Sequence, residues 1–184
     1  MCAWSYPTAV AVAPGGYAAV AYAAESDPTT LRVFDTWDGL PGPTFPLPNP
    51  GPRPPAVTPD PSPFTPLVVF TPDGDRLAVG HGTGLAVHDT KTGERVGCAT
   101  QPAEVTGLGW SADGRWLFVG RLDGTVLAAD PARPLVGVSF RWHLGPVYTL
   151  AASPAGDVVA SGGVDGVKLW PMRRLLAGRK RPPG

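Results

Sequence analysis

The sequence has few cysteines, few charged residues and no long apolar run. Its two cysteines, Cys2 and Cys98, are too few for a disulfide framework or a zinc site, so we expect a reducing, cytoplasmic location. Charged residues make up 16% of the chain and form no basic stripe, which argues against a nucleic-acid surface. The longest apolar stretch, 8–24, is interrupted at 14–16, so we expect no membrane-spanning segment. No Lys or Arg precedes it, which argues against a signal peptide.

Motifs of common enzyme classes are also missing. The sequence has no Gly-rich phosphate loop, no Gly-x-Ser-x-Gly elbow and no paired-His zinc motif. We therefore expect no catalytic residue, cofactor, metal or small-molecule substrate. The lone Cys98 is expected to be a small buried residue in a strand.

The charges that are present are distributed unevenly. The formal net charge is zero, yet Arg173, Arg174, Arg179, Lys180 and Arg181 all lie in the last twelve positions. The preceding residues are therefore mildly acidic. We interpret the segment 173–184 as a solvated basic tail in preference to an anchor for nucleic acid or acidic lipid.

Glycine and proline, 24 residues each, punctuate an internal repeat. An apolar strand followed by a Pro/Asp/Gly turn begins at Val10, Val68, Leu108 and Leu150. The last three copies begin 40 and then 42 residues apart, and the first gap is 58. This pattern is typical of many short strands joined by tight turns.

A second motif follows each turn. It consists of a short strand, a Gly-containing turn and a strand that ends in an aromatic-Asp pair or in a diverged form of that pair. The turns Asp123-Gly124 and Asp165-Gly166 are strong hairpin signals, because glycine accepts the positive φ of a type I′ turn. The predicted inner strands are 8–13, 17–23, 30–35, 66–71, 76–80, 85–89, 105–110, 116–120, 125–129, 147–152, 157–161 and 167–170. Weaker outer strands are predicted at Glu94 to Ala99, Leu135 to Trp142 and Cys2 to Tyr6.

Four such units resemble the WD-repeat family of β-propellers, and the fourth is the best match. The resemblance implies an all-β fold of four-stranded antiparallel blades. It also implies a structural tetrad of His143, Ser161, Asp165 and Trp170, in which Trp170 donates to Ser161. A Ser-His-Asp catalytic triad is the weaker interpretation of the first three, because Trp170 completes the family pattern.

The predicted domain organisation is one run of blades with an insertion. The blades cover about 1–40, 66–100, 103–142 and 143–172 within residues 1–172. The segment 41–66 carries twelve prolines and is predicted to be an irregular loop, because proline cannot donate to a strand ladder. We expect it to be a solvated insertion in preference to a docking segment. Replacement of 48–63 by a short linker should then leave folding unchanged.

The resemblance implies a non-catalytic scaffold that binds protein partners of unknown identity. The turns between inner strands lie on the propeller face that the family commonly uses. The candidate contact residues there are His81, Arg121, Leu122, Trp142 and Val164. An enzyme with a channel-mouth site is the less favoured alternative, since the inner strands carry mainly Ala, Val, Leu, Gly and Trp.

Four units are few for a WD-type ring. A second alternative is therefore that the chain is a fragment or half of a larger propeller. We predict an open four-blade arc in isolation or a homodimer that completes a ring of eight. In that dimer, the strand Cys2 to Tyr6 would fill the missing outer position of the last blade.

Overall fold

The computed structural model describes residues 5–14, 16–24, 30–35, 39–49, 51 and 66–175, which form four antiparallel sheets. The first sheet contains β1 (Ser5–Val12), β2 (Tyr17–Ala24), β3 (Thr30–Asp35) and β4 (Pro41–Pro46). The second contains β5 (Leu67–Phe70), β6 (Arg76–His81), β7 (Gly84–Asp89) and β8 (Arg95–Thr100). The third contains β9 (Val105–Trp110), β10 (Leu117–Arg121), β11 (Thr125–Asp130) and β12 (Arg133–Arg141). The fourth contains β13 (Val147–Ala152), β14 (Val158–Gly163) and β15 (Gly166–Pro171), followed by the helical turn α1 (Met172–Leu175).

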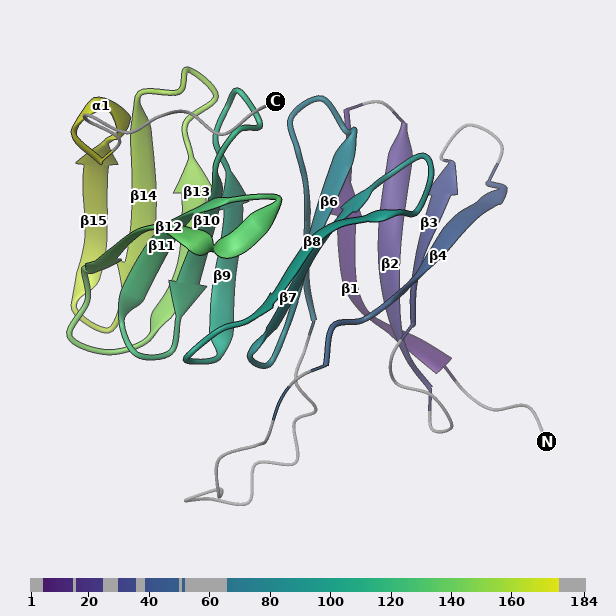
Figure 1. Ribbon diagram of the computed structural model, residues 1–184, viewed down its shortest axis with the longest axis horizontal. Coiled ribbons are helices and arrows are strands. Elements are labelled where there is room, and N and C mark those ends of the chain that lie inside the picture. The colour runs from purple at the N-terminus through teal and green to yellow at the C-terminus, as the bar shows by residue number, and fades with distance from the viewer. Residues whose placement is uncertain are drawn as a thin grey trace.

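The sheets stand side by side in chain order, as blades of a propeller do (Figure 1). Their first strands form the inner row, in which β1 contacts β5, β5 contacts β9 and β9 contacts β13. The first and fourth sheets lie at opposite ends of this arc (Figure 1). The predicted all-β fold of antiparallel blades is confirmed, and the twelve predicted inner strands are all present.

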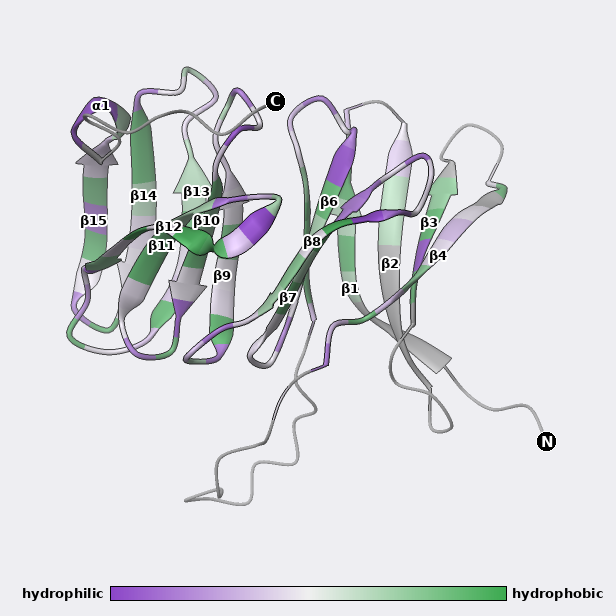
Figure 2. Cartoon of the chain, in the orientation of Figure 1, coloured by the Kyte–Doolittle hydropathy of each residue, from purple (hydrophilic) through white to green (hydrophobic). Residues whose placement is uncertain are grey.

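Each junction between neighbouring sheets buries one apolar cluster. Successive side chains of a strand point to opposite faces, so one strand supplies residues to the junctions on both of its sides. Leu31, Val33 and Phe45 fill the first junction, and Leu85, Val87 and Trp110 belong to the second. Hydrophobic residues gather in the strands and hydrophilic ones mark most of the connecting turns (Figure 2).

The start of the Pro-rich segment is a strand, and the predicted irregular loop is wrong for this part. β4 pairs antiparallel with β3, and Phe45 on it is fully buried against the second sheet. β4 is an edge strand, where proline is tolerated because one side of the strand needs no donor. Residues 48 and 49 also contact Gly84, so the part expected to be dispensable begins after Gly51. Residues 52–65 lie outside the described residues.

The fourth sheet has three strands within the described part of the chain. Its outer strand β15 has no neighbour on its far side there. Ser5 and Tyr6, expected in an outer strand, instead begin β1 and pair with Ala24 and Ala23. Residues 1–4 and the tail beyond Leu175 are outside the described ranges.

Candidate functional site

One edge of the arc is built from two kinds of connection. The turns between second and third strands meet the loops that lead into the next sheet. In the last two sheets the backbone N–H groups of Trp142 and His143 both donate to the Gly124 carbonyl at 3.1 Å. The loop after β12 is therefore fixed to the turn between β10 and β11.

His143 ties this loop to the fourth sheet. Its ring is buried between the Asp165 carboxylate at Nδ1 and the Ser161 hydroxyl, which lies 2.8 Å from Nε2. A carboxylate can only accept, so Nδ1 is the donor to Asp165. A Cβ at position 163 would lie 2.6 Å from Nδ1, which explains the glycine at that position.

Asp165 is held by three groups. Besides His143, it accepts from Lys168 Nζ at 2.7 Å and from the Leu144 N–H at 3.2 Å. The hydrogen bonds from Lys168 and His143 hold the pKa of Asp165 well below its ordinary value. Lys168 also donates to the Trp142 carbonyl. The carboxylate therefore joins the β14–β15 turn to the loop that precedes β13.

Trp170 does not make the expected bond to Ser161. Its indole Nε1 is buried and has no hydrogen-bond partner among the described residues. The ring instead stacks on Trp142, with centroids 4.3 Å apart and planes 18° from parallel. The structure thus brings His143, Ser161 and Asp165 together, while Trp170 contributes packing across the junction between the third and fourth sheets.

The five candidate contact residues lie along this edge but differ in exposure. Leu122 and Val164 are exposed, whereas Arg121 and Trp142 are buried and His81 is half-buried. Arg121 donates to Gln101 at 2.7 Å, and burial lowers the pKa of its guanidinium. His81 Nδ1 lies 3.2 Å from the Pro48 carbonyl. The buried residues Arg121 and Trp142 therefore pack beneath the surface of this edge and stabilise it.

Sequence reasoning missed the most exposed member of the edge. Leu144 is 86% exposed and lies in the loop between His143 and Gly145. A Cβ at Gly145 would lie 2.9 Å from Val164, so this loop and the β14–β15 turn are in close contact. Leu122, Leu144 and Val164, here called the apolar edge patch, therefore occupy three adjoining connections. The signal in the sequence that could have identified Leu144 is the presence of an apolar residue inside a polar and glycine-rich loop.

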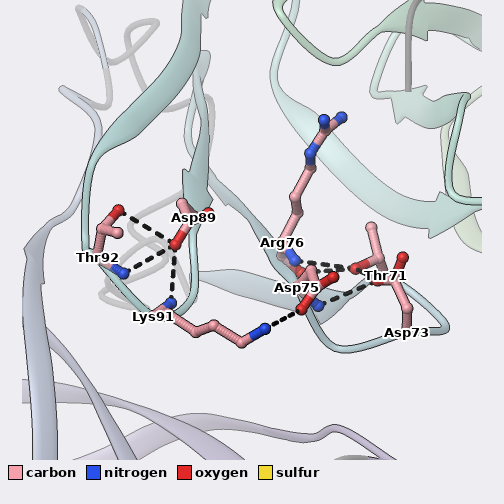
Figure 3. A network of polar contacts seen from close by, with 7 residues as sticks. All are labelled: Thr71, Asp73, Asp75, Arg76, Asp89, Lys91 and Thr92. Atoms are coloured by element: carbon pink, nitrogen blue, oxygen red, sulfur yellow. Dashed lines mark hydrogen bonds and ion pairs between the residues drawn. The ribbon is translucent and has the colours of Figure 1, made fainter.

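The opposite edge carries a group of carboxylates (Figure 3). Asp73 accepts from the Thr71 hydroxyl at 2.6 Å, and this bond lowers the pKa of Asp73. Asp89 accepts from the Thr92 N–H at 2.8 Å, which lowers its pKa in the same way. Lys91 pairs with Asp75 at 2.8 Å. The first two bonds brace their own turns and the Lys91–Asp75 pair joins one turn to the other, so we assign these groups a structural role.

Within the described part of the chain, no group of three or more His, Cys, Asp or Glu side chains is placed to hold a metal ion. No described helix is long and apolar enough to cross a membrane. Cys98 lies on β8 and is exposed, so the prediction that it is buried is wrong.

The sheets and the His143 network define blades of a β-propeller. The family model described as "WD domain, G-beta repeat" matches residues 94–127 and 135–170, so these two segments are similar to WD repeats. The chain is 28% identical over 102 residues to "Serine-threonine kinase receptor-associated protein" of Gallus gallus, covering 55% of this chain and 29% of that protein. It is 31% identical over 107 residues to "WD repeat and FYVE domain-containing protein 2" of Mus musculus, covering 56% and 26%. It is 32% identical over 84 residues to "Pre-mRNA-processing factor 19" of Oryza sativa subsp. japonica, covering 42% and 16%. The chain therefore spans less than a third of the length of these relatives.

Proposed function

We propose that the chain is a non-catalytic scaffold that binds a protein partner through the apolar edge patch. The observation that carries this proposal is the exposure of Leu122, Leu144 and Val164, at 42%, 86% and 62%. Exposed apolar side chains that gather on one edge mark interaction surfaces in soluble proteins. The similarity to WD repeats supports an interaction scaffold in general.

The His143 network supports the proposal by fixing the loop that carries Leu144. A loop held in its bound conformation loses little entropy when a partner docks. The Leu144 N–H bonds to Asp165, and Asp165 bonds to the buried ring of His143. The polar residues thus have a positioning role, and the apolar patch makes the contact.

Binding through this patch is tested with two variants and one control. Leu144→Asp and Val164→Asp place a charge in the patch, and Leu135→Asp places one on β12, where Leu135 is also exposed. Each purified chain is immobilised and exposed to an extract of the source cells, and retained proteins are quantified. Because a contact worth about 1.4 kcal/mol changes affinity tenfold, we expect at least a tenfold loss of specific proteins with both patch variants.

The control must retain the same proteins as the wild-type chain. If Leu135→Asp and the patch variants lose the same proteins equally, the patch is not the contact surface. If all four chains retain identical sets, the proposal is wrong.

We further propose that the four sheets are part of a larger ring in the cytoplasm, completed by other blades. The two end sheets support this, since each presents an apolar face with no described sheet against it. A second copy of the chain is one source of the missing blades.

A further inference from the structure

The fourth sheet exposes residues that the other sheets bury. Val33 on β3, Val87 on β7, Ala128 on β11 and Leu169 on β15 occupy one position, since each lies two residues before the last residue of its strand. The first three are at most 1% exposed, whereas Leu169 is 67% exposed. Two residues earlier, Leu31, Leu85 and Val126 are equally buried and Val167 is 74% exposed.

The inner strand of the first sheet also exposes residues that the other sheets bury, but on the opposite face. Val12 occupies the position of Phe70 and Trp110, because each lies one residue before the turn that joins the first two strands of its sheet. Phe70 and Trp110 are buried, at 7% and 5% exposure, whereas Val12 is 70% exposed. Val10 is 68% exposed, while Leu150, at the same position of the fourth sheet, is buried.

By position in their strands, the two exposed faces correspond to the two faces that meet at each junction inside the chain. Inside the chain, a Cβ at Gly80 would lie 2.9 Å from Val105 and 3.3 Å from Leu108, and one at Gly120 would lie 2.8 Å from Val147 and 3.2 Å from Leu150. The missing side chain at each glycine thus lets a valine and a leucine of the next inner strand approach closely. Gly162 occupies this glycine position in the fourth sheet, and Val10 occupies the leucine position in the first. A Cβ at Gly162 would lie 2.9 Å from the Thr149 side chain of the same sheet. The two faces therefore correspond through their exposed side chains, Val167 and Leu169 on the fourth sheet and Val10 and Val12 on the first.

We propose that these faces meet between two copies of the chain. The fourth sheet of each copy packs on the first sheet of the other, which makes two identical junctions and closes a ring of eight blades. The first and fourth sheets lie at opposite ends of the arc, so they are placed to meet the ends of another copy (Figure 1). A head-to-tail contact of this kind forms a closed assembly when the rotation between copies closes. Eight blades lie within the range that propellers use.

This proposal rests on the proposed larger ring. It adds that a second copy of the chain supplies the missing blades and that the fourth sheet of one copy packs on the first sheet of the other. The full chain is measured by light scattering coupled to gel filtration, with Val10→Lys, Leu169→Lys and the control Leu135→Lys. The wild-type chain and Leu135→Lys should elute at twice the 19.1 kDa mass of one chain. Val10→Lys and Leu169→Lys should each be monomeric, with unchanged circular dichroism, because both side chains are exposed in the single chain.

Mixing the two monomeric variants gives the sharpest result. A pair with one copy of each has one wild-type junction, so the mixture should recover at least part of the dimer. A contact between two copies of the same face predicts that only one of the two variants is monomeric, and that result would overturn the proposal. A monomeric wild-type chain would overturn it as well. Neither result changes the retention test of Leu144 and Val164, so the two proposals fail separately.

Discussion

His143 helps to link the third and fourth sheets by polar contacts on the edge that carries the apolar edge patch. Ser161 is buried and supplies the group at its Nε2. Ser161→Ala should lower the free energy of unfolding by about 1–3 kcal/mol, because the ring nitrogen stays buried without a partner. Urea denaturation measures the change. Ser139→Ala on the exposed side of β12 is the control and should change little. Equal effects of the two substitutions would contradict a structural role for Ser161.

Asp165 should give the protein an acid-sensitive contribution to stability. Its pKa lies below the ordinary carboxyl value in the folded chain, so ionised Asp165 stabilises the fold at pH values above about 4. This contribution decreases as the pH falls below that value toward the folded pKa. The melting temperature of the wild-type chain should therefore fall more steeply between pH 5 and pH 2 than that of Asp165→Asn. Asp73 and Asp89 are present in both chains, so parallel curves would show that Asp165 makes no such contribution.

The repeat pattern located His143, Ser161 and Asp165 because their spacing follows from strand and turn lengths. It did not reveal the stacking of Trp170 on Trp142, which depends on how the fourth sheet packs beside the end of β12. It also did not reveal that Arg121 is buried against Gln101, because the two residues are twenty positions apart and meet only through sheet packing. Local spacing is readable in the sequence, whereas contacts between sheets depend on the completed packing.

The turns between first and second strands share a side-chain hydrogen bond in the second and third repeats. Ser111 donates to Asp113 at 2.6 Å, as Thr71 does to Asp73. The fourth repeat has Ala155 at this position, after Ser153. Ala155→Asp should raise the free energy of unfolding by about 0.5–1.5 kcal/mol by restoring the bond.

Thermal denaturation checks this gain, with Ala155→Asn as the matched control. The amide lacks the charge that strengthens the bond in the other two turns, so it should stabilise the chain less. A lower melting temperature for Ala155→Asp than for the wild type would show that the three turns are not equivalent.

β4 should contribute to stability despite its prolines. Phe45 is fully buried against the second sheet and lies in edge contact with His88, at a centroid distance of 4.9 Å. Phe45→Ala should cost about 3–5 kcal/mol, as large core truncations do. Thr44→Ala, an exposed neighbour, should be nearly neutral. Replacement of residues 52–65 by a Gly/Ser linker should leave the melting temperature unchanged, and a loss of several degrees would contradict this.

The inner strands were predictable because each has an apolar run bounded by turn residues. β4 was not, since three of its six residues are proline and its pairing partner β3 lies beyond a separate loop. The single buried aromatic, Phe45, was the residue that distinguished this stretch from the rest of the Pro-rich segment. Edge strands are difficult to recognise from sequence because half of their backbone groups need no partner.

At the scale of the whole molecule, the end sheets keep apolar residues at positions that the interior sheets bury. Repeat proteins that end in solvent usually carry a polar outer face on the terminal unit. Val12 and Leu169 are instead large aliphatic residues, and both are mostly exposed. The repeat count in the sequence predicted an incomplete ring. The structure adds which faces are open and which apolar residues they expose.

Electron microscopy of the purified full chain tests the central claim most directly. We expect a closed ring of eight radial blades with two-fold symmetry, in which the first sheet of one copy follows the fourth sheet of the other. Averages that show a single four-blade arc, or two arcs joined through identical ends, would contradict it.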